Sequence, residues 1–274
     1  MRARRFGLAV IVALLFAAMT RAMAAPADDL DLVVIPGGAF VMGDPEGEPD
    51  EVLRAVVVGP FRLMRFEVTN RQFSRFVLES GHRTDPERSG EGFVWTDRWR
   101  AVAHADWRHP AGPEATLVGL DDHPVVQVSA SDAAAFCAHY SLRLPRDEEW
   151  EFAARGLDGR RFPWGNAPPE EQGHRRANFG SLKCCAPDAS DGYLRTAPVG
   201  RFPSGVSPFG LYDMAGNVWE WTGSRIPGRP EEVALRGGGW GNDAYGLRTS
   251  YRHGNPPNIG LDMVGFRCAG ERAD

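Results

Sequence analysis

The chain has 274 residues, of which 24% are charged and 43% are hydrophobic. This length suits one large domain or two small ones. With 31 Lys and Arg residues against 36 Asp and Glu residues, the formal net charge is −5, so the composition gives no electrostatic footprint for binding nucleic acid.

The first 24 residues have the pattern of a secretory signal peptide. Arg2, Arg4 and Arg5 form a basic start, Leu8–Met19 is wholly apolar, and Ala22–Ala24 is a small-x-small cleavage site. The apolar run is shorter than the roughly 20 residues of a spanning helix, although an uncleaved anchor stays open as the alternative. The pattern predicts a periplasmic or secreted protein with no membrane span after cleavage.

The mature chain then covers residues 25–274 and is more acidic than the full chain. The signal removes four arginines and no acidic residue, so the balance becomes 27 − 36 = −9. A chain of this negative charge could bind hard cations. Export would place it in an oxidising compartment in which disulfides persist.

Regular structure is expected to be sparse, because 32 glycines and 21 prolines are spread along the chain. Leu32–Met42 predicts two short strands around a Pro-Gly-Gly turn, and Phe61–Val68 predicts another strand. Apolar spacing and capping residues predict helices over Asn70–Glu79, Ser131–His139 and Arg146–Arg155.

Two further stretches are less regular in pattern. Gly81–Val118 is rich in Trp and His and is interpreted as a long irregular segment, which is usually functional or packed on itself. Asn217–Trp221 alternates and predicts an edge strand that carries two core tryptophans.

A series of motifs resembles one known family, in the family's order and over nearly the whole mature chain. The resemblance is to the formylglycine-generating, sulfatase-modifying enzyme family. It implies an α+β fold, with a single domain of the C-type-lectin-like kind over residues 25–274 and little regular secondary structure. The motifs are PGGAFVMGD (Pro36–Asp44), FEVTNRQFSRFV (Phe66–Val77), ADWRHPAGP (Ala105–Pro113), DHPVVQVS (Asp122–Ser129), LPRDEEWEFAARG (Leu144–Gly156), FPWGN (Phe162–Asn166), TAPVGRFP (Thr196–Pro203), FGLYDMAGNVWEW (Phe209–Trp221), RGGGW (Arg236–Trp240) and VGFRCA (Val264–Ala269).

The cysteine pair that carries this family's chemistry is missing. By resemblance it belongs in Trp240–Arg248, where this chain has Asn242, Asp243 and Ala244. Binding of Cu(I) through thiolates needs two cysteine ligands close together, and the only thiol after Ala186 is Cys268. Formylglycine generation is therefore not expected, and a role for copper or iron stays open.

Any other chemistry is expected in the groove where the family binds its substrate. The candidates are aromatic, basic and polar residues from two stretches of the chain. They are Trp107, Arg108, His109, Trp240, Asp243, Tyr245, Arg248, Arg252 and His253. For each histidine, a structural hydrogen bond is the alternative to acid–base chemistry.

The resemblance also implies two structural calcium sites made of side-chain oxygens and backbone carbonyls. The first comprises Asn178 and Asp191 with the carbonyls of Phe179 and Tyr193, and the second comprises Asp213 and Glu220 with the carbonyls of Gly216 and Val218. Asp213 stands where relatives often have Asn. The alternatives are that Asp191 only starts a turn and that Glu220 pairs with an arginine.

The four cysteines form two groups. The resemblance implies a disulfide between Cys137 and Cys268, against the alternative of two buried thiols. Cys184 and Cys185 are adjacent and form a possible vicinal redox pair: a labile disulfide, two reduced thiols or a thiolate pair for a metal.

These observations predict an exported maturation or accessory factor, with a protein partner or peptidic substrate in the periplasm. Its task would be to assist an oxidation or the assembly of a metalloenzyme such as copper nitrite reductase. In export and cysteine loss the chain resembles the pyoverdine chromophore maturation protein and the copper nitrite reductase accessory protein. A non-catalytic lectin-like binding module and an atypical metal-dependent oxidase are the alternatives.

Overall fold

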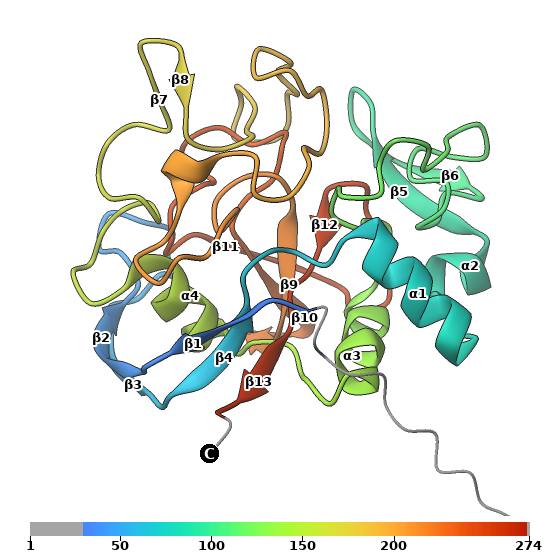
Figure 1. The fold of residues 1–274 in the computed structure, drawn as a ribbon. Coiled ribbons are helices and arrows are strands. Elements are labelled where there is room, and N and C mark those ends of the chain that lie inside the picture. Colours follow the sequence, from blue (N-terminus) through green and yellow to red (C-terminus); the bar gives the residue numbers. More distant parts are fainter. Residues whose placement is uncertain (1–29, 273–274) are drawn as a thin grey trace, which may run out of the picture.

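The computed structural model describes residues 30–272 (Figure 1). The predicted signal peptide, residues 1–24, lies outside the described residues. Within residues 30–272, no helix is long and apolar enough to cross a bilayer.

Short helices and strands, joined by long loops, make up the domain. The elements are β1 (Leu32–Ile35), β2 (Gly38–Met42), β3 (Arg54–Val58), β4 (Phe61–Met64), α1 (Asn70–Ser80), α2 (Asp85–Ser89), β5 (Glu91–Trp95), β6 (Trp99–Ala103), α3 (Ala130–His139), α4 (Asp147–Arg155), β7 (Glu170–Glu171), β8 (His174–Arg175), the 3₁₀ turn η2 (Pro203–Gly205), β9 (Trp219–Ile226), β10 (Arg229–Arg236), β11 (Arg252–Asn255), β12 (Val264–Gly265) and β13 (Ala269–Glu271). This composition confirms the expected α+β class with little regular structure.

The three predicted helices are present, with ends within one residue of the prediction. Local capping boxes fix the starts of two of them. At α1 the Thr69 hydroxyl accepts a hydrogen bond from the Gln72 backbone amide, and the Gln72 side chain accepts one from the Thr69 backbone amide. Helix α3 begins with the same arrangement at Ser129 and Asp132. Helix α1 ends at Gly81, whose φ of 68° lies in the left-handed region that favours glycine.

Two sheets meet near the centre of the molecule (Figure 1). One has the order β1-β4-β13, so strands from both ends of the described chain flank β4. The other has the order β11-β10-β9-β12, with only the β12–β9 pair parallel. The strand predicted at Asn217–Trp221 is therefore present as the start of β9, but it lies inside the sheet rather than at its edge.

The segment from Gly81 to Val118 is more regular than expected. It contains α2 and the β5–β6 hairpin, which pairs Glu91–Trp95 with Trp99–Ala103. Thr84 and Glu87 form a capping box at the start of α2, a local signal that the interpretation as an irregular segment missed.

The core has two main clusters: the larger packs α1 and α3 against β9 and β10, and the smaller packs α4 against β1, β2, β3 and β4. In the larger cluster the rings of Phe73, Phe136 and Phe266 pack together, with Phe73 and Phe136 stacked at 5.9 Å. Beside them a disulfide joins Cys137 on α3 to Cys268, with 5.6 Å between their Cα atoms, as the resemblance implies. This cluster holds α1 and α3 against the sheet that carries the candidate site.

Candidate functional site

A cavity of about 550 Å³ opens beside the four-stranded sheet. Its walls come from the β5–β6 hairpin, β9, β10, β11, β12 and several loops that are distant in sequence. Aromatic and aliphatic side chains dominate the lining: Phe93, Trp99, Trp219, Tyr251, His253, Leu235, Ile259, Leu261, Met263 and Val264, with Lys183, Cys184, Cys185, Asn242 and Asn255 supplying the polar and sulfur atoms. An apolar cavity with a few polar groups is the usual form of a ligand site.

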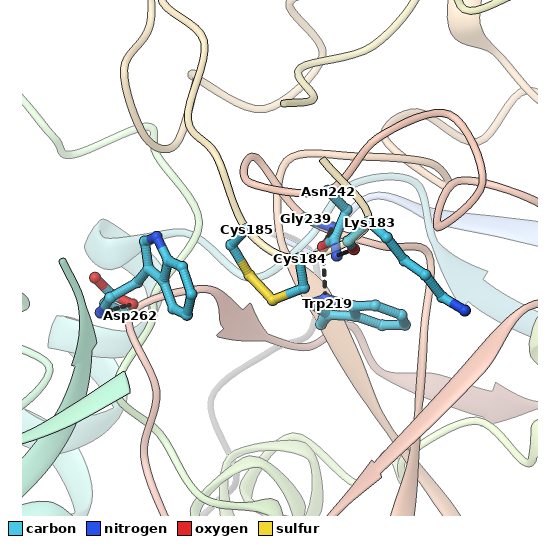
Figure 2. Close-up of a disulfide and its surroundings, with 8 residues drawn as sticks. Lys183, Cys184, Cys185, Trp219, Gly239, Asn242 and Asp262 are labelled. Atoms are coloured by element: carbon cyan, nitrogen blue, oxygen red, sulfur yellow. Dashed lines mark hydrogen bonds between the residues drawn. A yellow bond between two sulfur atoms is a disulfide. The ribbon is translucent and has the colours of Figure 1, made fainter. Parts of the chain in front are cut away.

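The Cys184–Cys185 pair lines this cavity as a vicinal disulfide (Figure 2). Cys184 is exposed, whereas Cys185 is buried. Close approach of the neighbouring loop is possible because Gly241 has no side chain: a Cβ there would lie 3.1 Å from the Cβ of Cys185. Of the states left open by the sequence, the structure contains the disulfide.

Backbone hydrogen bonds fix the cysteine loop to the loop after β10. The Ala186 amide donates to the Gly241 carbonyl at 2.9 Å, and the Asp243 amide donates to the Leu182 carbonyl at 2.7 Å. The vicinal pair therefore lies beside Asn242, inside the stretch to which the resemblance assigns the missing catalytic pair.

Asn242 uses both ends of its side-chain amide in hydrogen bonds within the site. Its Oδ1 accepts from Trp219 Nε1 at 2.9 Å and from the Gly239 amide at 3.0 Å, and its Nδ2 donates to the Lys183 carbonyl at 2.7 Å (Figure 2). This amide connects the cysteine loop to β9. Since Trp240–Arg248 has no thiol, these residues do not fit a thiolate-bound copper ion.

Contrary to expectation, Trp107, Arg108 and His109 lie outside the cavity lining. The Trp107 indole is buried in the core, edge-on to Phe73 at 5.3 Å. Arg108 donates to a Glu87 carboxylate oxygen at 2.5 Å, and the His109 ring lies 3.1 Å from Asp106. The Trp107 ring thus packs in the core, Arg108 pairs with Glu87, and His109 contacts Asp106.

Arg248 and Arg252 are also outside the cavity lining, because both serve buried ion pairs. Arg248 donates to both carboxylate oxygens of Glu51, at 2.8 and 2.9 Å. Arg252 lies 3.2 Å from a carboxylate oxygen of Asp147, on the charged side of the sheet. Arg252 instead lines a neighbouring hollow, which shares Lys183 and His253 with the cavity.

Trp240, Asp243 and Tyr245 support the site without lining it. Trp240 is buried and donates through Nε1 to the Asp262 carbonyl at 3.2 Å. The Asp243 carboxylate accepts from the Tyr245 amide at 3.0 Å, and the Lys183 ammonium lies 4.7 Å from the centre of the Tyr245 ring.

Of the groove candidates, His253 is the one that lines the cavity. Its ring centre lies 5.8 Å from that of Trp219. His253 keeps exposed surface, and partial loss of water around the ring lowers its pKa below the ordinary histidine value. Sequence reasoning missed Trp99, Tyr251 and Met263 as lining residues, although the hairpin containing Trp99 could have been recognised from its strand pattern.

The first predicted calcium site contains two buried oxygens without a hydrogen-bond partner: Oδ1 of Asn178 and Oδ2 of Asp191. Burial raises the pKa of Asp191, whose other oxygen accepts from the Tyr193 amide at 2.9 Å. The Arg175 guanidinium donates to the Phe179 carbonyl at 2.9 Å and lies 3.7 Å from Asp191. Orphaned oxygens of this kind fit a cation, so the site stays a prediction with support from its donor set.

At the second predicted site, Glu220 is engaged by other groups. Arg267 donates to both of its oxygens, at 2.7 and 2.8 Å, and Trp150 donates at 2.8 Å. Burial raises the pKa of Asp213 to about 6 and that of Glu67 well above the ordinary value, with further repulsion from Glu220. Glu220 therefore does pair with an arginine, Arg267. However, this one buried guanidinium interacts with three carboxyl groups, those of Glu220, Glu67 and Asp213.

Backbone geometry at this second site is that of a tight turn. Gly216 has a φ of 83° and Asn217 a φ of 60°, both in the left-handed region. The Asn217 side chain donates to Glu67 at 2.7 Å, and the Val218 amide donates to Glu67 at 3.3 Å. Among the described residues, no group of three or more His, Cys, Asp or Glu side chains is arranged to hold a metal ion.

Comparison with known proteins agrees with this geometry. A family model described as the sulfatase-modifying factor enzyme 1-like domain matches residues 18–272. The chain is 40% identical over 269 residues to the "inactive C-alpha-formylglycine-generating enzyme 2" of Bos taurus, covering 88% of each chain. It is 36% identical over 285 residues to the formylglycine-generating enzyme of Thermomonospora curvata, covering 88% of this chain and 93% of that one.

Among solved structures, PvdO from Pseudomonas aeruginosa superposes with a TM-score of 0.69 and 29% identity, over 88% of this chain and 94% of the other. The superposition covers most of both chains, so it is a similarity of the whole domain. The chain belongs to the sulfatase-modifying factor family of formylglycine-generating-enzyme-like proteins.

Proposed function

We propose that this chain is an exported accessory or maturation factor that binds a segment of a partner protein in its apolar cavity and does not itself generate formylglycine. The partner reaction would be an oxidation or the assembly of a metalloenzyme, such as copper nitrite reductase, in the periplasm. Membership of the family supports an accessory or oxidase-type role, and the absence of a cysteine from Trp240–Arg248 favours the accessory role.

The observation that carries this proposal is the state of Asn242. Its amide holds the cysteine loop to Trp219 and Gly239, which supports a structural role for this residue at the position where the family has its thiols. The similarity to a relative named inactive supports the same reading.

The cavity has the properties of a site for a protein segment. Aromatic side chains in a pocket of this size are typical of the residues that dominate binding energy at interfaces. Trp99 on the hairpin and Ile259 on the opposite loop are partly buried, which leaves apolar surface for a side chain of the partner. Two disulfides suit an oxidising compartment.

Calcium is proposed as a structural ion that stabilises the long loops. The unpaired oxygens of Asn178 and Asp191 support the first site, and the excess of buried carboxylates around Asp213 supports the second. Such an ion stabilises the folded chain because it binds only that state.

Enzyme activity is tested on the chain processed and exported by its host. The purified protein is loaded with Cu(I) under reducing conditions and incubated in air with a cysteine-containing peptide, whose mass is then followed. We expect no aldehyde product and no stoichiometric copper at Trp240–Arg248. Conversion of the peptide cysteine to formylglycine would contradict the proposal.

Partner binding is tested by capture from the host periplasm with quantitative mass spectrometry. Ile259→Glu places a charge in the cavity and should abolish enrichment of the partner. Val118→Glu is the matched control, because Val118 is an exposed apolar residue outside the cavity lining. Equal enrichment by Ile259→Glu and the parent chain would remove the cavity from the proposed function.

A further inference from the structure

The Cys184–Cys185 disulfide is the one disulfide among the described residues that opens to the cavity. Cys137 and Cys268 have no exposed surface, whereas Cys184 is exposed and both members of the vicinal pair line the cavity. Thiol–disulfide exchange requires access of a thiolate to one sulfur atom. Access therefore separates the two disulfides of this chain.

We propose that the Cys184–Cys185 disulfide is a thiol-exchange site, which oxidises a pair of thiols on a ligand bound in the cavity to a disulfide. The proposal rests on the proposed function, in that the ligand is a dithiol segment of the partner protein. It assigns a redox activity to the cavity that needs no metal and no oxygen in the exchange step.

The surroundings of the pair are suited to a bound apolar segment. Figure 2 shows the disulfide beside the indole of Trp219, with Asn242 and Lys183 close by. Met263 lines the same cavity, and Met263 and Cys185 both lie close to Gly241. A cysteine flanked by apolar or aromatic residues would therefore reach the exposed sulfur of Cys184 while its neighbours bury apolar surface.

The loop can change redox state without losing its anchors. The Ser181 amide donates to the Ala186 carbonyl at 3.1 Å, and Asn242 Nδ2 donates to the Lys183 carbonyl at 2.7 Å. These bonds close the loop on both sides of the pair, and none of them uses a sulfur atom. Reduction therefore leaves the two cysteines held at the cavity.

A proton acceptor is available in the same cavity. His253 lines it and keeps exposed surface, and partial loss of water around the imidazole lowers its pKa, which favours the neutral ring near pH 7. A neutral imidazole can take the proton of an incoming thiol and so raise the fraction of reactive thiolate.

The exchange proceeds in two balanced steps. A ligand thiolate attacks Sγ of Cys184; the Cys184–Cys185 bond breaks, and its electron pair leaves on Sγ of Cys185, which takes up the proton released by the ligand. The second ligand thiolate then attacks the ligand sulfur of the mixed disulfide, which releases the ligand disulfide and the Cys184 thiol. Two ligand thiols are oxidised, and one disulfide of this chain is reduced.

The first test compares the two disulfides within one molecule. The oxidised chain is mixed with reduced glutathione, quenched at successive times, alkylated and mapped by mass spectrometry. Cys184–Cys185 should be reduced about tenfold or more faster than Cys137–Cys268, because only the former is accessible to a thiolate. Reduction of both disulfides together, or of Cys137–Cys268 first, would overturn the proposal.

The second test measures single-turnover oxidation of a synthetic dithiol peptide, Cys-Gly-Phe-Cys, by the oxidised chain. One peptide disulfide should form for each Cys184–Cys185 pair reduced, and Ile259→Glu should slow the peptide reaction, whereas Val118→Glu, outside the cavity lining, should react at the parent rate. His253→Gln should slow the peptide reaction, with His174→Gln, an exposed histidine outside the cavity lining, as the matched control. Equal peptide rates in the parent chain and Ile259→Glu would overturn the role of the cavity.

Cysteine variants complete the test. Cys184→Ser and Cys185→Ser should each abolish peptide oxidation, and the remaining thiol should alkylate faster in Cys185→Ser, which retains the exposed cysteine. Circular dichroism of each variant confirms that it is folded. A chain that captures its partner but never oxidises the peptide refutes the exchange site alone, whereas failed capture refutes the proposed function.

Discussion

Replacement of Asp213 by Asn should stabilise the metal-free chain at neutral pH. Asp213 is buried, and the loss of water around its carboxylate raises its pKa from 3.8 to about 6, with Glu220 adding repulsion. At about 1.4 kcal/mol per pKa unit, the charged carboxylate costs up to about 3 kcal/mol of folding free energy. An amide removes that cost and can still accept the hydrogen bond that Gly200 donates at 2.6 Å.

The pH dependence gives this prediction its sign. Because the folded-state pKa lies above the unfolded value, the folded chain keeps a proton on Asp213 that the unfolded chain has lost between about pH 4 and 6. Stability therefore falls as the pH rises through that window. Asp213→Asn should unfold at higher urea concentration than the parent at about pH 7.5, and the difference should nearly vanish at about pH 4.

The assay is urea unfolding followed by tryptophan fluorescence, with chelator present in one series and calcium in another. Calcium should shrink the gain, because a carboxylate is a stronger ligand for this ion than an amide. Asp188→Asn is the control with the opposite sign, since hydrogen bonds lower the pKa of Asp188. A gain of the same size at both pH values, or a loss at about pH 7.5 in chelator, would refute the electrostatic reasoning.

Three other changes test the framework of the domain. Asp191→Ala should remove the calcium-induced rise in melting temperature, which corresponds to about 2.7 kcal/mol at a hundredfold excess over the dissociation constant. The double variant Cys137→Ser/Cys268→Ser should lower the free energy of unfolding in urea by about 3–5 kcal/mol, mainly because the unfolded chain gains freedom. Glu220→Gln should lower the free energy of unfolding by about 3–5 kcal/mol, because the fully buried Arg267 loses the carboxylate that accepts two of its hydrogen bonds.

Each of these changes has an outcome that contradicts its reasoning. A calcium response that persists in Asp191→Ala would place the ion elsewhere. An unchanged urea midpoint in the double cysteine variant would show that the bond adds nothing to the packed core. Wild-type stability in Glu220→Gln would mean that neighbouring carboxylates, such as Glu67, neutralise Arg267 by themselves.

The helices were predictable from the sequence because their signals are local. Thr69 and Gln72 stand three residues apart, as a capping box requires, and Gly81 ends the same helix. The same signal is present at Thr84, but the interpretation of the surrounding segment as irregular missed it. The fold class followed from ordered motifs, since these extend over nearly the whole domain.

The cavity could not be predicted from local pattern. The parallel bridge between Leu182 and Asn242 brings the cysteine pair beside the stretch where the family has its catalytic cysteines. Neither loop has a sequence pattern that predicts contact with the other. Arg248 resembled a groove residue for a similar reason: its partner Glu51 lies 197 residues away. Buried ion pairs and exposed binding residues use the same side chains, so sequence separates them poorly.

Strand β13 makes completion of the first sheet depend on the last part of the domain to be synthesised. Strands β4 and β13 pair although they are far apart in the sequence. For example, the Arg62 side chain donates a hydrogen bond to the Glu271 carbonyl across a sequence separation of 209 residues. Until Ala269–Glu271 arrives, one side of β4 keeps unpaired amide and carbonyl groups, which is a template for aggregation. A truncated or stalled chain is therefore expected to be a substrate for chaperones and proteases, whereas an extension after β13 leaves the pairing intact.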